Sequence, residues 1–74
     1  MNKQRRNEIK NLSQRLRQIN SGLQKVLDDE QDYYDNIPEN LQTSSRADDY
    51  EEAIDQLTEV IEEIEELIGT LSGI

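Results

Sequence analysis

The chain contains no cysteine, histidine, tryptophan or phenylalanine. Without cysteine it can form no disulfide, and without cysteine and histidine it lacks the usual ligands of zinc sites. It also lacks the thiol and the imidazole base that nucleophilic enzymes commonly use. A catalytic pair of carboxylates would need an enclosed pocket, and the two helices that the sequence predicts below provide none. The sequence therefore predicts a protein that is not an enzyme and that carries no metal or cofactor.

Long apolar runs are missing as well. No stretch approaches the roughly 18 consecutive apolar residues of a membrane span, and no apolar run follows the basic N-terminal residues as in a signal peptide. Basic residues are scarce, because eight lysines and arginines stand against 17 acids, for a net charge of −9. This balance disfavours direct binding to nucleic acid or to anionic membranes. We expect a soluble, cytoplasmic protein, and the lack of cysteine fits a reducing compartment.

Apolar residues recur with heptad spacing in a first segment. They are Ile9, Leu12, Leu16, Ile19, Leu23, Val26 and Tyr33. The steps alternate between three and four residues, and only Glu30 interrupts them. Such spacing is typical of the seam of a coiled-coil helix, and it predicts a helix from about Lys3 to about Asp35.

A second segment repeats the heptad pattern without interruption. Its members are Tyr50, Ile54, Leu57, Ile61, Ile64, Ile68 and Leu71. They predict a helix from about Arg46 to about Leu71. Ser45 and Asp48 have the spacing of a capping box at its start, and Gly69 and Gly73 mark its end.

Residues 36–44 join the two predicted helices. Pro38 moves Ile37 out of the helical region and so ends the first helix. A connection this short makes the helices antiparallel. The expected fold is therefore all-α, a two-helix hairpin that occupies residues 1–74 as one domain, with Ile37 and Leu41 folded back over the end of the interface.

The second helix carries a third apolar column, which the first helix lacks. This column consists of Ala53, Val60, Leu67 and Ile74. One antiparallel neighbour covers two columns, so the third predicts a further interface. A chain of 74 residues buries too little surface to be comfortably stable alone. We therefore expect self-association of two hairpins into a four-helix bundle, and the alternative is an interface for a foreign partner.

Acidic residues are concentrated after residue 27, which leaves the loop end of the hairpin strongly negative. Residues 28–74 carry 16 acids and one base, Arg46, whereas residues 1–27 carry seven bases and one acid. Acids at a helix C-terminus cost about 0.3–1 kcal/mol each, so their presence there suggests a role other than helix stability. The candidate partner-binding residues are Asp32, Tyr34, Asp35, Glu39, Asn40, Arg46, Asp48 and Asp49. The alternative is a solvated acidic end without a partner.

The two adjacent tyrosines are expected to differ. Tyr33 is in register with the seam, which predicts a place in the core, whereas Tyr34 is expected among the exposed acids. An amphipathic ring in a charged patch is a frequent binding anchor.

The stretch from Tyr34 to Gln42 reads Tyr-Asp-Asn-Ile-Pro-Glu-Asn-Leu-Gln. Together with its flanks, about residues 30 to 57, it resembles a family of small proteins from phages, prophages and bacteria of the Firmicutes. Those proteins carry an aromatic–Asp-Asn-x-Pro-Glu-Asn-Leu-Gln motif before an acidic helix. The resemblance implies an accessory protein of a mobile element. The family has no assigned activity, so no functional residue carries over.

Two classes of function follow from these observations. In the first, the chain is an acidic protein-binding module that inhibits a host or defence protein with a basic surface, with mimicry of DNA as a special case. In the second, it is a structural part whose function is self-association. A small regulator of transcription is a weaker third possibility, and nothing in the sequence separates it from the first.

Overall fold

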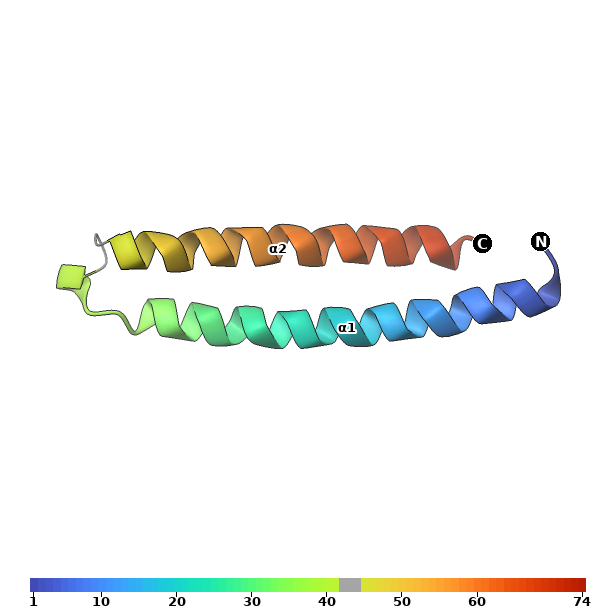
Figure 1. The fold of residues 1–74 in the computed structure, drawn as a ribbon, viewed down its shortest axis with the longest axis horizontal. Helices are drawn as coiled ribbons and strands as arrows, with labels where there is room; N and C mark the ends of the chain where they lie inside the picture. The colour runs from blue at the N-terminus through green and yellow to red at the C-terminus, as the bar shows by residue number, and fades with distance from the viewer. Residues whose placement is uncertain (42–44) are drawn as a thin grey trace.

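The computed structural model describes residues 1–41 and 45–74, without the side chains of residues 45 and 46. Two long helices, α1 (Lys3–Asp35) and α2 (Ser45–Ser72), are joined through a short 3₁₀ helix, η1 (Glu39–Leu41), and the described residues contain no strand. The helices lie antiparallel along their length, and both ends of the chain meet at one end of the molecule (Figure 1). The prediction of an all-α helical hairpin is confirmed.

Both ends of α1 are held by asparagine side chains. The side chain of Asn2 accepts a hydrogen bond from the backbone N–H of Arg5 at 2.8 Å, which satisfies a donor that the helix leaves free. At the other end, Asn36 Nδ2 donates to the carbonyl of Asp32 at 2.7 Å. Beyond Asn36 comes Ile37, which Pro38 keeps out of the helix. The capping role predicted for Ser45 at the start of α2 lies outside the described side chains.

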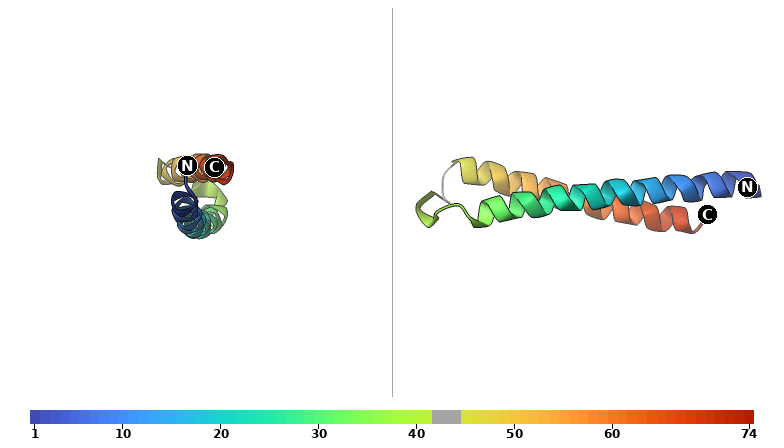
Figure 2. Two further views of the ribbon diagram at one scale, coloured as in Figure 1. Left: turned by 90° about the vertical axis from the view of Figure 1, so that its right-hand side faces the viewer. Right: turned by 90° about the horizontal axis from the view of Figure 1, so that it is seen from below.

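The hairpin is a thin rod rather than a globule. It measures 59 × 14 × 12 Å and has a radius of gyration of 17.2 Å, against about 11 Å for a compact chain of this length. Seen end-on, α1 and α2 lie one against the other (Figure 2). Its accessible surface is 5974 Å², against about 4,700 Å² for a compact monomer of this mass. A single hairpin therefore leaves an unusual amount of surface in contact with solvent.

The side of α2 that faces α1 is the one predicted from its heptads. Ile61 and Ile68 are buried, and with Ala47 they form the buried apolar core. The other members of the predicted α2 seam are half-buried, namely Tyr50, Ile54, Leu57, Ile64 and Leu71. Regular alternation of three and four residues keeps this stripe against α1 along the whole helix.

The prediction for α1 is wrong in one of its two columns. Ile9, Leu16 and Leu23 do face α2, but the column of Leu12, Ile19, Val26 and Tyr33 is exposed. The second inward column instead consists of Ser13, Asn20, Leu27 and Tyr34. The polar members, Ser13 and Asn20, are buried. Helix α1 is thus rotated about its own axis, relative to the expected orientation, by about half of the angle that separates two successive residues.

A physical reason for this orientation is visible at the middle of the seam. Ser13 and Asn20 have small side chains, which let the helices approach closely, and Asn20 Nδ2 donates to the carbonyl oxygen of Ile61 at 3.4 Å. The same rotation exchanges the expected places of the two tyrosines. Tyr33 is 67% exposed and Tyr34 is half-buried, so the prediction of a core Tyr33 and an exposed Tyr34 is wrong.

The connection covers the end of the seam only in part. Ile37 is half-buried, as expected for a residue that folds back over the interface, whereas Leu41 in η1 is 50% exposed. The expectation that both residues plug the interface is therefore correct for Ile37 and wrong for Leu41.

Candidate protein-interaction surfaces

Both helices present an apolar column to solvent. The α1 column is Leu12, Ile19, Val26 and Tyr33, and the α2 column is Ala53, Val60, Leu67 and, just past the helix, Ile74. Apart from the half-buried Ala53, these side chains are 42–67% exposed. Consecutive members are seven residues apart in both columns, so each column follows its helix from end to end.

The two columns lie on the same side of the hairpin. Each α1 member directly precedes a seam residue, as Ile19 precedes Asn20, and α2 repeats this order, as Val60 precedes Ile61. Both columns are therefore displaced from their seams by the same rotation about the helix axis. Because the helices run in opposite directions, equal rotations lead to the same side. Ile74 lies past the end of α2 and lines the groove beside Lys3 and Arg6, so it is left out. We call the surface of the other seven residues the apolar face.

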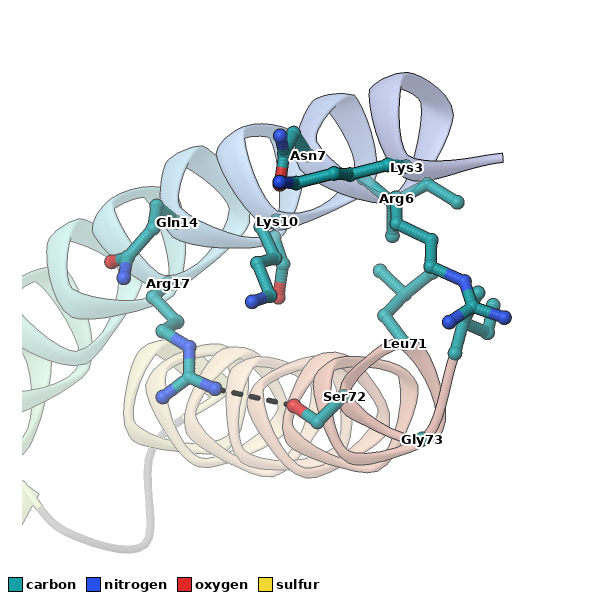
Figure 3. Close-up of a pocket in the computed structure, with 12 residues that line it drawn as sticks. Lys3, Arg6, Asn7, Lys10, Gln14, Arg17, Leu71, Ser72 and Gly73 are labelled. Atoms are coloured by element: carbon teal, nitrogen blue, oxygen red, sulfur yellow. Dashed lines mark hydrogen bonds between the residues drawn. The ribbon is translucent and has the colours of Figure 1, made fainter. Parts of the chain in front are cut away.

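The opposite side of the hairpin is polar. Arg17 donates from its guanidinium to Ser72 Oγ at 3.4 Å across the two helices (Figure 3). Lys3, Arg6 and Lys10 line the same groove, between the first turns of α1 and the last turn of α2. One side of the rod is thus hydrated and the other apolar, which is the division expected of a helix pair that buries one side in an assembly.

The loop end carries the predicted partner-binding residues, which we call the acidic end. Exposed side chains there are Asp32, Asp35, Glu39, Asn40, Asp48 and Asp49. Tyr34 is half-buried in the seam, and the side chain of Arg46 lies outside the described ones. The exposed acids do not all share one face, because consecutive residues such as Asp48 and Asp49 point about 100° apart around α2. They are spread over several sides of the loop end rather than gathered in one flat patch.

An apolar hollow lies at the acidic end, and the heptad pattern does not predict it. It has a volume of about 520 Å³ and is lined by Tyr33, Asn36, Ile37, Pro38, Leu41, Ala47 and Tyr50. The rings of Tyr33 and Tyr50 stack across the helices, with centroids 6.2 Å apart and planes 19° apart. We call this site the aromatic hollow. The sequence pattern does not reveal it, because heptad register places Tyr33 in the seam rather than in the exposed column.

Other kinds of site find little support in the described chain. Within residues 1–41 and 45–74, no three His, Cys, Asp or Glu side chains gather so as to hold a metal ion. None of the described helices is both long and apolar enough to cross a membrane. Comparisons of the chain with protein-family models, with curated proteins and with solved structures found no match. The apolar face and the acidic end therefore have to be interpreted from their own chemistry.

Proposed function

We propose that this chain is a non-enzymatic protein-interaction module whose first partner is a second copy of itself, two hairpins forming a four-helix bundle. One observation carries the proposal: two exposed apolar columns share one side of the hairpin. Apolar contact area of this kind is the main favourable term in association. A second hairpin offers the same heptad spacing, and therefore matching ridges and grooves, to cover it.

The amount of excess surface agrees with a dimer. The hairpin exposes roughly 1,300 Å² more than a compact monomer of its mass. A specific interface of ordinary size removes about 800 Å² from each partner. A dimer through the apolar face would therefore remove most of the excess, and it would give the two-helix rod the core that it lacks.

A charge placed on the apolar face should break the dimer. We expect the Ile19→Asp variant to sediment as a monomer, or with a dissociation constant raised at least about 100-fold, because an aspartate cannot be buried unpaired in the interface. The matched control is Gln18→Asp, which adds the same charge one residue earlier, on the outermost side of α1. Sedimentation velocity over a range of concentrations measures both masses.

Either of two results would count against self-association. One is a wild-type chain that sediments as a monomer at every concentration up to the millimolar range. The other is an Ile19→Asp variant that keeps both the wild-type mass and the wild-type melting temperature. Equal loss of mass in the Gln18→Asp control would show that added negative charge, and not its place, disrupts the assembly.

The aromatic hollow favours a second function for the acidic end, the binding of a basic partner protein. An apolar site at an end of the rod that is rich in exposed carboxylates is complementary to a segment that carries apolar and basic residues in alternation. The resemblance to phage and prophage proteins suggests a host or defence protein as the owner of that segment. Binding there would block the partner's basic surface, and blocking a DNA-binding surface would be mimicry of DNA.

An amphipathic peptide of leucine and lysine is a direct probe of this site. We expect it to shift the NMR signals of Tyr33 and Tyr50 at low salt, and to be released as salt rises, because exposed charges are screened within about 10 Å at 0.1 M. In the Leu41→Ser variant the hollow loses apolar surface and gains no charge, so the affinity should fall about tenfold. The control is Gln18→Ser, on the outermost side of α1, away from both the hollow and the apolar face.

The outcome separates the two functions. Shifts confined to the aromatic hollow, lost in Leu41→Ser and kept in Gln18→Ser, support binding at the acidic end. Shifts spread over all acidic residues and insensitive to Leu41→Ser mean charge attraction alone, and they leave self-association as the whole function. For mimicry of DNA, the further test is competition between the chain and duplex DNA for one captured protein.

A further inference from the structure

We infer that the second copy docks head to tail, with the acidic end of each hairpin beside the chain ends of the other. This inference rests on the proposed self-association and adds its geometry. Two symmetric arrangements bring the apolar face onto itself. A two-fold axis along the rod sets both loops at one end and stacks α1 on α2, whereas an axis across the rod sets the loops at opposite ends and stacks α1 on α1 and α2 on α2.

The charges of the two halves of the rod differ sharply. The half with the chain ends, residues 1–19 and 62–74, holds six bases and five acids. The half with the loop, residues 20–61, holds two bases and 12 acids. Loops at the same end would bring two strongly negative halves together. The head-to-tail arrangement instead places each negative half beside a half that carries most of the bases.

The two apolar columns are centred at the same level of the rod, as a crosswise two-fold axis requires. The α1 column is centred between Ile19 and Val26, at residues 22–23, and the first three members of the α2 column are centred on Val60. The hydrogen bond from Asn20 to Ile61 fixes the register of the helices. Two residues closer to the loop on each helix, residue 22 of α1 lies opposite residue 59 of α2. Residue 59 is the neighbour of Val60.

An axis at this level pairs most members of the columns by size. In the α1 column it sets Ile19 opposite Val26 of the other copy, and Leu12 opposite Tyr33. In the α2 column it sets the small Ala53 opposite the larger Leu67, with Val60 opposite Val60 of the other copy. Apart from Leu12 and Tyr33, large side chains then face small ones or members of similar size meet, as close packing of facing positions requires.

The residues beside the α1 column agree with the same axis. Arg15, Gly22 and Asp29 are seven residues apart and flank the column on the side away from the seam. With Gly22 at the axis, Arg15 of one copy is level with Asp29 of the other, so opposite charges meet twice. Gly22 itself has no side chain, and a Cβ built there would meet nothing within 4 Å in the single hairpin. The seam therefore does not require a glycine, whereas the meeting of two α1 helices benefits from one.

Cysteine cross-linking tests the arrangement cleanly, because the chain has no cysteine of its own. We expect the Gly22→Cys and Val60→Cys variants to form covalent dimers upon oxidation, or with a short bis-maleimide, since both positions lie at the proposed axis. Glu62→Cys, on the outer side of α2, is the control and should give less than about a tenth of that yield. A disulfide needs Cα atoms within about 7 Å of each other, so distant cysteines do not react.

A distance measurement gives a positive answer for either arrangement. Spin labels on the Asn40→Cys variant should lie near opposite ends of the rod, which is 59 Å long, in the head-to-tail dimer. A separation below about half that length, in a sample whose mass is that of a dimer, would overturn the head-to-tail arrangement and leave self-association intact. A monomeric mass would overturn both proposals.

Discussion

Replacing Ile61 by alanine is expected to lower the stability of the protein strongly. Ile61 is 4% exposed, and together with Ala47 and Ile68 it makes up the buried apolar core. Truncation of a buried isoleucine costs about 2–5 kcal/mol, because transfer energy is lost and a cavity remains. In a domain of this size each kcal/mol lowers the melting temperature by about 4–8 °C. We therefore expect a fall of at least about 10 °C, measured by the loss of helical circular dichroism on heating.

The neighbouring Glu62→Ala variant is the control for this prediction. Glu62 is exposed and points away from α1, so its replacement should change the free energy of unfolding by less than about 0.5 kcal/mol. If Ile61→Ala melts within about 3 °C of this control, the seam described here does not stabilise the protein.

The sequence was sufficient to predict the hairpin because heptad spacing constrains a helix strongly. In α2, Ile54, Ile61 and Ile68 can be brought together on one side only if the segment is helical, and Pro38 leaves one place for the turn. The exposed column of α2 was predictable from the number of its apolar columns. One antiparallel neighbour covers two of the three, so the third stays exposed. These predictions needed no knowledge of the partner helix.

The orientation of α1 could not be predicted in the same way. Its column at Ile9, Leu16 and Leu23 can pair with the column before it or with the column after it, because both lie at heptad spacing. Counting apolar side chains favours the column of Leu12 and Ile19 over that of Ser13 and Asn20. Such a count treats the hairpin as the whole molecule. It gives the wrong answer if the best apolar column is reserved for another chain.

The orientation of α1 is therefore the strongest link between sequence and assembly. A lone hairpin would gain by burying Leu12 and Ile19 rather than Ser13 and Asn20. In a four-helix bundle, the apolar column of Leu12 and Ile19 and the polar column of Ser13 and Asn20 are both covered. The polar column then belongs in the seam with α2, where its smaller side chains let the two helices approach. The cost of one buried amide in the hairpin is then offset by a continuous apolar surface for the second copy.

The same shift displaced the candidate binding site. Tyr33 moved from the expected core to the rim of the aromatic hollow, where it meets Tyr50, and Tyr34 took its place in the seam. The concentration of charge at the acidic end is predictable from the sequence, since composition alone shows it. The apolar surface among those charges depends on which side of α1 faces outward, so it emerged only with the structure.

Replacing Asn20 by leucine is expected to stabilise the protein and to make its assembly less specific. Asn20 is 8% exposed, its Oδ1 accepts no hydrogen bond from the described residues, and its one bond, to the carbonyl of Ile61, is long at 3.4 Å. Burial of a poorly paired amide costs about 1–3 kcal/mol, so its removal should raise the melting temperature by several degrees. Asn20→Ala is the control, because it also removes the amide but adds no apolar volume.

The loss of specificity follows from the columns of α1. With leucine at position 20, α1 has three nearly equivalent apolar columns, and either pair can face α2. A buried polar residue at such a position commonly fixes helix register and the number of chains at a cost in stability. We therefore expect Asn20→Leu to show more than one set of amide signals by NMR, or a mixture of masses by sedimentation, while Asn20→Ala keeps one. A variant that is less stable than the wild type and still uniform would mean that Asn20 holds the seam together, rather than selecting which side of α1 remains free for the second chain.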